Sequence, residues 1–158
     1  MSRIQKLYDV ARGRVFFFDF GFVDRCCCTS EVNHVDSPHY ALCIGYKHKR
    51  MTSFWLPLFS RDTGGKHGEI CSQYKIGDRR WVDNSTYYYC NQIYVLKFST
   101  LQRVTGCDNS SVGNFVDGEG MQNIKNCCAH HIDCLPTRVH PVLKRWDALA
   151  TARSLSSY

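Results

Sequence analysis

Three runs of apolar residues in the first part of the chain have the composition of β-strands. They are Val15–Phe20, His39–Tyr46 (HYALCIGY) and Ser53–Phe59 (SFWLPLF). Valine, isoleucine and aromatic residues favour strands, and glycine or polar segments bound each run. Pro57 weakens the third strand, since proline is tolerated only at sheet edges and bulges. Residues 21–38 have little periodicity and predict a long loop between the first two strands.

After residue 60 the pattern of apolar residues indicates secondary structure less clearly. Glu69–Ile76 and Arg80–Val82 are strand candidates on either side of Gly77-Asp78, a pair that predicts the turn of a hairpin. Ser85–Tyr94 begins with a β-rich run, whereas Leu96–Val104 has apolar residues in a more helical rhythm. These segments predict further strands that lead into a short helical turn.

Beyond residue 106 the chain changes character. Asn, Asp, Ser and Gly dominate up to Gly120, and a cluster of Cys and His follows. Val142–Leu155 carries an apolar stripe at roughly 3.6-residue spacing, which predicts one amphipathic helix. We therefore expect a mainly β (α+β) fold with about five strands, all upstream of residue 100. We expect residues 1–106 to form the core domain. The Cys- and His-containing tail, residues 107–158, is expected to pack its helix on that core.

Composition adds a basic surface to this picture. The 158 residues include 20 Lys and Arg against 14 Asp and Glu, a net charge of +6, which favours an anionic partner such as RNA. No run of about 18 apolar residues exists, and residues 1–14 lack the apolar core of a signal peptide. We expect no membrane partner and a cytoplasmic location, with the ten cysteines mostly reduced and used for packing.

Three of these segments together resemble the PemK/MazF family of toxin endoribonucleases. GRVFFFDFG (Gly13–Gly21) is similar to the family's first strand, HYALCIGY to the strand after an Arg-Pro pair, and WLPLFSR (Trp55–Arg61) to its Pro-x-Thr-Ser strand end. A weaker match, Ser85–Arg103, extends the likeness over about residues 12 to 105. The resemblance implies a small SH3-like or CcdB-like barrel of five to seven strands with a C-terminal helix. It also implies a homodimer and a cognate antitoxin protein.

The catalytic pair that the resemblance implies is altered in this chain. The family uses an arginine at the head of the second strand and a threonine or serine at the end of the third, without a metal. The arginine position holds His39, or Ser37 if Pro38 is matched to the family proline. The threonine position holds Phe59 with Ser60 beside it.

The replacements still offer chemistry for RNA cleavage. An imidazole titrates near neutrality, so His39 can act as base or acid, and Ser60 or Arg61 can hold the phosphate. The alternative is that His39 is an ordinary histidine at a strand end. Ser60 and Arg61 then belong to a solvated turn ahead of Gly64-Gly65.

Basic residues outside this group are candidates for RNA contacts. They are Arg14, Lys47, Lys49, Arg50, Lys66 and His67. Lysine and arginine bind phosphates along a groove, but a charged run is also the ordinary composition of a solvated face.

A cluster in the tail has the spacing of half a zinc site. Cys127, His130, His131 and Cys134 are close enough for two or three of them to share one ion, with further ligands needed from elsewhere. The alternative is reduced thiols and exposed histidines. No P-loop, dinucleotide fingerprint, HExxH or GxSxG occurs, and no cofactor is expected.

Two functions follow from the sequence. The first is a metal-independent endoribonuclease of toxin type that cuts single-stranded RNA by means of its 2′-OH. The second is a non-catalytic barrel of the same kind that binds nucleic acid or a protein partner, with or without a zinc-bound tail.

Overall fold

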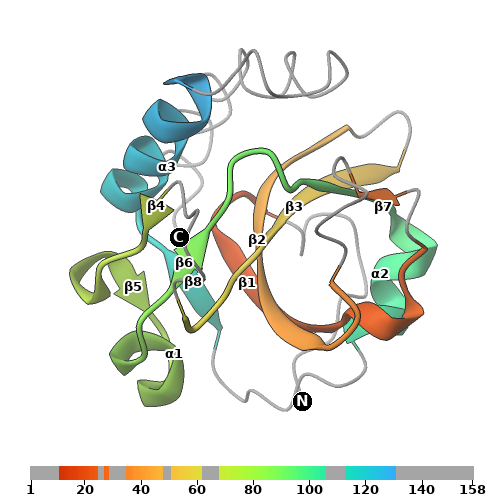
Figure 1. Ribbon diagram of the computed structural model, residues 1–158, viewed down its shortest axis with the longest axis horizontal. Coiled ribbons are helices and arrows are strands. Elements are labelled where there is room, and N and C mark those ends of the chain that lie inside the picture. The colour runs from red at the N-terminus through yellow and green to blue at the C-terminus, as the bar shows by residue number, and fades with distance from the viewer. Residues whose placement is uncertain are drawn as a thin grey trace.

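The computed structural model describes residues 11–24, 27–28, 35–47, 51–61, 68–105 and 113–130 (Figure 1). Two 3₁₀ turns in these ranges are η2 (Phe20–Phe22) and η5 (Ser72–Tyr74). The helices are α1 (Arg79–Asp83), α2 (Phe98–Val104) and α3 (Gly118–His130). The strands are β1 (Arg14–Asp19), β2 (Pro38–Lys47), β3 (Thr52–Pro57), β4 (Gly68–Glu69), β5 (Lys75–Ile76), β6 (Tyr87–Tyr88), β7 (Tyr94–Lys97) and β8 (Asn114–Val116).

Most of the strands form one antiparallel sheet of six in the order β5-β8-β1-β2-β3-β7. A second sheet consists of β4 and β6, and the two sheets are joined where Phe59, just after β3, pairs with Tyr87. In the described residues the end strands β5 and β7 do not pair with each other, so the sheet is open. The mainly β class is confirmed, whereas closure into a barrel is not shown.

The three strands predicted from apolar runs are confirmed as β1, β2 and β3, because their side chains are buried on both faces of the sheet. Phe16 and Phe18 of β1 belong to one hydrophobic cluster, and Val15 belongs to the other. Two buried faces require apolar residues at successive positions, which is why these strands read as continuous runs. Pro57 ends β3 at a position that β7 does not reach, so its missing N–H removes no bond to that strand.

One face of the sheet is covered by α2 and is mainly aromatic. Phe18 packs on Trp55 with ring centroids 4.6 Å apart, and Phe20 packs on Tyr94 at 4.9 Å. Leu101 of α2 is fully buried in this cluster. The helical rhythm predicted for residues 96–104 is thus confirmed as α2.

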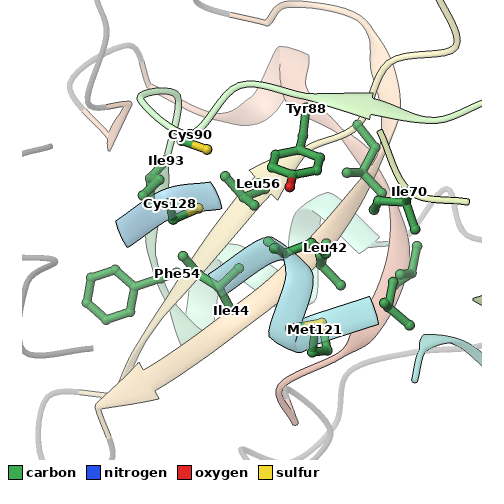
Figure 2. Packing of buried hydrophobic residues seen from close by; sticks show 14 of the residues in the cluster. Leu42, Ile44, Phe54, Leu56, Ile70, Tyr88, Cys90, Ile93, Met121 and Cys128 are labelled. Atoms are coloured by element: carbon green, nitrogen blue, oxygen red, sulfur yellow. The ribbon is translucent and has the colours of Figure 1, made fainter. Parts of the chain in front are cut away.

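The opposite face is mainly aliphatic and is covered by α3 (Figure 1). Figure 2 shows Leu42, Ile44 and Leu56 of the sheet in one cluster with Met121 of the helix. Ile124 and Cys128 of α3 are buried in the same cluster, whose full membership is Val15, Leu42, Ile44, Phe54, Leu56, Leu58, Ile70, Trp81, Tyr88, Cys90, Ile93, Val116, Met121, Ile124 and Cys128.

The hairpin predicted around Gly77-Asp78 is wrong. Residues 80–82 lie in α1 rather than in a strand, and β5 pairs with β8. Asp78 caps the helix, since its carboxylate accepts the Trp81 N–H at 2.9 Å. Gly77 makes the turn with φ +143, and a Cβ there would lie 2.1 Å from the Asn114 side chain.

The prediction that all strands lie upstream of residue 100 is also wrong. β8 pairs with both β1 and β5, so the segment after residue 106 supplies a strand inside the main sheet. Next, α3 begins where the Asp117 carboxylate accepts the Gly120 N–H at 2.8 Å. The amphipathic helix predicted at Val142–Leu155 lies outside the described residues. In the described residues, no helix has the length and apolar character to cross a membrane.

Candidate functional site

A cleft of about 290 Å³ opens between the first residues of β2, the segment after β3, and α1 with the residues that follow it. It contains two of the three predicted catalytic residues, His39 and Ser60. The third, Arg61, is exposed beside Ser60 and does not line the cleft. The lining residues are Phe17, Pro38, His39, Tyr40, Leu58, Phe59, Ser60, Arg80, Trp81, Asn84, Ser85 and Thr86.

His39 is held by a hydrogen bond at each ring nitrogen. Nδ1 lies 3.1 Å from the carbonyl oxygen of Leu58, and Nε2 lies 3.1 Å from the hydroxyl of Ser37. A carbonyl oxygen can only accept, so Nδ1 carries the proton of this bond. In the neutral ring, Nε2 then has the lone pair and accepts from Ser37.

Burial favours that neutral form. It lowers the pKa of His39 below its ordinary value of 6.5, while the hydrogen bond to Leu58 and the charge of Asp36 act in the opposite direction. At pH 7 the imidazole is therefore mainly unprotonated, with Nε2 directed at a serine that is itself exposed. This is the state in which a histidine can act as a general base.

Aromatic rings make up much of the cleft wall. Tyr40 packs on Phe17 at 5.2 Å and on Trp81 at 5.5 Å between ring centroids. The His39 ring lies 5.1 Å from Phe59. The polar groups of the lining belong to His39, Ser60, Arg80 and residues 84–86. Flat apolar walls with a few polar groups suit a planar ligand such as a nucleobase.

The α1 wall is fixed at its N-terminal end by side-chain hydrogen bonds. Asn114 of β8 donates through Nδ2 to the Asp78 carboxylate at 2.9 Å and accepts the Asp78 N–H at 3.0 Å. Trp81 donates its indole N–H to the Phe115 carbonyl at 3.2 Å. Trp81 is thereby fixed in position relative to the main sheet.

Lys75 fixes the other end of this wall. Its ammonium donates to the carbonyl oxygens of Trp81 and Asn84, at 3.3 and 2.5 Å, and to the Thr86 hydroxyl at 2.7 Å. The ammonium also lies 4.7 Å from the centre of the Trp81 ring. Burial lowers the pKa of Lys75 to about 8, against the opposing charges of Glu69 and Cys71. Lys75 thus supports three residues that line the cleft.

Among the described residues, the arginine or lysine that lines the cleft is Arg80, which sequence reasoning missed. Its side chain is exposed on α1. Arg80 was missed because residues 80–82 were predicted to form a strand, although Asp78 followed by Arg-Arg-Trp is a recognisable helix start. An exposed guanidinium at the rim can bind a phosphate.

The two predicted RNA contacts that the structure describes, Arg14 and Lys47, do not line this cleft. Arg14 is the first residue of β1, whereas the residue of β1 that pairs with His39 is Phe18. The guanidinium of Arg14 lies 4.8 Å from the centre of the Phe115 ring. Lys47 ends β2, eight residues from His39, which corresponds to roughly 26 Å along a strand. Lys49, Arg50, Lys66 and His67 lie outside the described residues.

The predicted zinc cluster is only partly described. Cys127 is half-buried and touches the thiol of Cys90, and His130 is exposed at the end of α3. His131 and Cys134 lie outside the described residues. Among the residues that are described, no three His, Cys, Asp or Glu side chains are grouped as metal ligands.

No protein-family model and no curated protein matches this chain. The likeness to PemK/MazF toxins therefore stays a resemblance.

Proposed function

We propose that this protein is a metal-independent endoribonuclease of the PemK/MazF-like toxin type. The observation that carries the proposal is the position of His39 in the cleft that Ser60 also lines, with its Nδ1 proton on a carbonyl and its Nε2 lone pair on the exposed Ser37 hydroxyl. Such a base is suited to a substrate that brings its own nucleophile, as RNA does with its 2′-OH.

In the proposed reaction, Nε2 of His39 removes the proton of the 2′-OH. The exposed Ser37 hydroxyl moves aside for the substrate. The 2′-oxygen then attacks the neighbouring phosphorus, and the bond to the 5′-oxygen breaks. Arg80 and Ser60 stabilise the charge on the phosphoryl oxygens, and water at the exposed rim protonates the departing oxygen. The products are a 2′,3′-cyclic phosphate and a 5′-hydroxyl.

The substrate class follows from the size and walls of the cleft. A volume of about 290 Å³ with aromatic walls accommodates about one nucleotide, whose base must be unpaired to enter. We therefore infer a single-stranded RNA substrate. From the resemblance we also propose an SH3-like or CcdB-like barrel, a homodimer, a cognate antitoxin and a cytoplasmic location.

The second candidate is a non-catalytic module that binds nucleic acid or a protein partner. It is favoured by Phe59, which stands where the resemblance places a threonine and packs against the His39 ring at 5.1 Å. A phenyl group supplies stacking but no hydrogen bond to a phosphate. Under this alternative the cleft binds a base and leaves the backbone uncut.

Cleavage of a fluorescent single-stranded RNA in the presence of EDTA distinguishes the two. We expect cutting by the full-length protein, a 2′,3′-cyclic phosphate product, and no cutting when the 2′-OH at the cleaved position is replaced by hydrogen. His39→Asn should lower kcat/KM by about 10²–10⁴-fold, because it removes the base. The acidic limb of the wild-type profile of kcat/KM against pH should have its midpoint below 6.5, in the direction that burial shifts this histidine.

Arg79→Ala is the control for a substitution outside the cleft, and it should cut RNA as the wild type does. Arg79 is adjacent to Arg80 but is 97% exposed and does not line the cleft. RNA binding without cutting in the wild type would support the module instead. Equal cutting by wild type and His39→Asn would remove His39 from the mechanism.

A further inference from the structure

Three thiols meet between the turn after β6 and the last turns of α3. The sulfur atoms of Cys90 and Cys127 lie 3.2 Å apart, although the residues are 37 positions apart in the sequence. Cys128 also hydrogen-bonds with Cys90. Figure 2 shows Cys90 above Cys128, with Ile93 beside them.

Core packing holds the two elements that carry these thiols. Ile124 and Cys128 of α3 are buried in the aliphatic cluster together with Tyr88, Cys90 and Ile93. The approach of Cys90 to Cys127 is therefore set by the fold. Two thiols in contact on separate elements are the arrangement from which a disulfide forms.

Access to the pair is unequal. Cys90 is fully buried, whereas Cys127 is half-buried and can be reached from solvent. The hydrogen bond with Cys128 and burial raise the pKa of Cys90, and burial raises the pKa of Cys127 to about 11. Cys127 is thus the first of the two to react, and because thiolate is scarce at neutral pH, the reaction is slow.

We propose that Cys90 and Cys127 are a reversible oxidation site, at which a small disulfide such as oxidised glutathione links α3 to the β6–β7 turn. This proposal is independent of the ribonuclease activity.

The chemistry is two thiol–disulfide exchanges. The Cys127 thiolate attacks one sulfur of the oxidised glutathione, forms a mixed disulfide and releases one glutathione thiolate. The Cys90 thiolate then attacks Sγ of Cys127, forms the protein disulfide and releases the second glutathione. The two protons lost by the cysteines end on the two glutathione molecules. Glutathione is reduced and the protein is oxidised by two electrons.

Cys128 is the competing partner, since it also contacts Cys90. Cys127 and Cys128 are adjacent residues of a helix, a geometry poorly suited to a bond between them. A disulfide between Cys90 and Cys128 would leave the more accessible Cys127 reduced. The identity of the linked residue therefore decides whether the assignment is correct.

Peptide mapping of the full-length protein tests the proposal. The protein is equilibrated with oxidised glutathione, quenched with acid, alkylated and digested with trypsin, and the peptides are identified by mass spectrometry. We expect peptides 81–97 and 126–138 to be linked through Cys90 and Cys127, and to separate after treatment with dithiothreitol.

Variants identify the partner. The link should be lost in Cys127→Ala and kept in Cys128→Ala. It should also be kept in Cys71→Ala, because Cys71 is exposed elsewhere on the surface. Circular dichroism establishes that each variant is folded, and mapping of the wild type gives the answer if a variant is not. A link through Cys128, no link under strongly oxidising glutathione, or one equivalent of bound zinc that blocks alkylation of both thiols would overturn the proposal.

Discussion

The two faces of the main sheet differ in how many reactive side chains solvent can reach. The aromatic face, under α2, packs rings such as Phe16 and Trp55 edge to face and is covered by segments that directly follow β1 and β7. The aliphatic face is covered by α1 and α3, which follow β5 and β8 and pack on residues of β1, β2 and β3 from much earlier in the chain. The cleft and the thiol pair both lie where this second covering meets the sheet.

The side chains that contribute most to stability and the proposed catalytic residues therefore lie in different parts of the fold. Trp55 also donates its indole N–H to Ser53 at 2.6 Å, so this buried polar atom has its partner inside the closed face. At the cleft, by contrast, His39 is only half-buried, and Ser60 and Arg80 are exposed to solvent. Substitutions on the two faces should therefore affect different measurements.

The largest effect is expected from Trp55→Ala, on the closed face. Trp55 is fully buried, and its loss should lower the free energy of unfolding by about 3–5 kcal/mol. The half-buried Phe17 lines the cleft, and Phe17→Ala should cost about 1–2 kcal/mol. Urea unfolding followed by circular dichroism compares the two. RNA cleavage per folded molecule should fall only for Phe17→Ala, and the reverse result would contradict the separation of the faces.

An intermediate effect is expected from Lys75→Met, which keeps the length of the side chain but removes its donors. The carbonyls of Trp81 and Asn84 lose a partner, so stability should fall by about 1–3 kcal/mol. The cleft wall should loosen as well, and KM for RNA should rise more than kcat falls. An unchanged KM would show that Lys75 does not position the wall.

The pH dependence of this variant sharpens the test. The pKa of Lys75 is about 8 in the folded protein and ordinarily 10.5. Between these values the unfolded chain binds more protons, so the stability that this lysine confers rises with pH. The difference between wild type and Lys75→Met in urea unfolding should therefore increase from pH 8 to 10.5. A flat difference would mean that its pKa is not lowered.

The smallest effect is expected at the rim. Arg80→Ala should leave the unfolding midpoint unchanged, because the side chain is exposed, but should weaken RNA binding. It should also reduce the slope of log K against log salt by about one. Arg79→Ala should change neither quantity. Fluorescence anisotropy with a labelled RNA measures both, and equal losses for the two variants would indicate a general charge effect.

The central strands could be predicted from sequence because burial on both faces leaves an unbroken apolar run. The other parts of the fold depend on contacts between distant segments. β8 has only Phe115 and Val116 as apolar residues, and it is a strand because β1 and β5 pair with it. α3 does carry a readable signal, since Met121, Ile124 and Cys128 follow helical spacing after a capping aspartate.

The cleft was predictable only in part, for the same reason. His39 and Ser60 could be named because they flank strands that the pattern reveals. Arg80 and Trp81 were missed because α1 has five residues, too few for periodicity to separate a helix from a strand, and the capping Asp78 was the one local signal of the helix. Its position depends on Lys75 and Asn114, which meet it only in the folded chain.

The junction between the two sheets also bears on how this protein can diversify. Phe59 and Tyr87 join the sheets by donating a backbone N–H to each other's carbonyl, at 2.9 and 2.8 Å, and almost any residue type can supply those atoms. Ser60 and Ser85, close to this junction, are exposed on the cleft rim. Mutations at the two serines can alter which ligand is preferred while the scaffold persists, so new specificities are accessible to selection without loss of the fold.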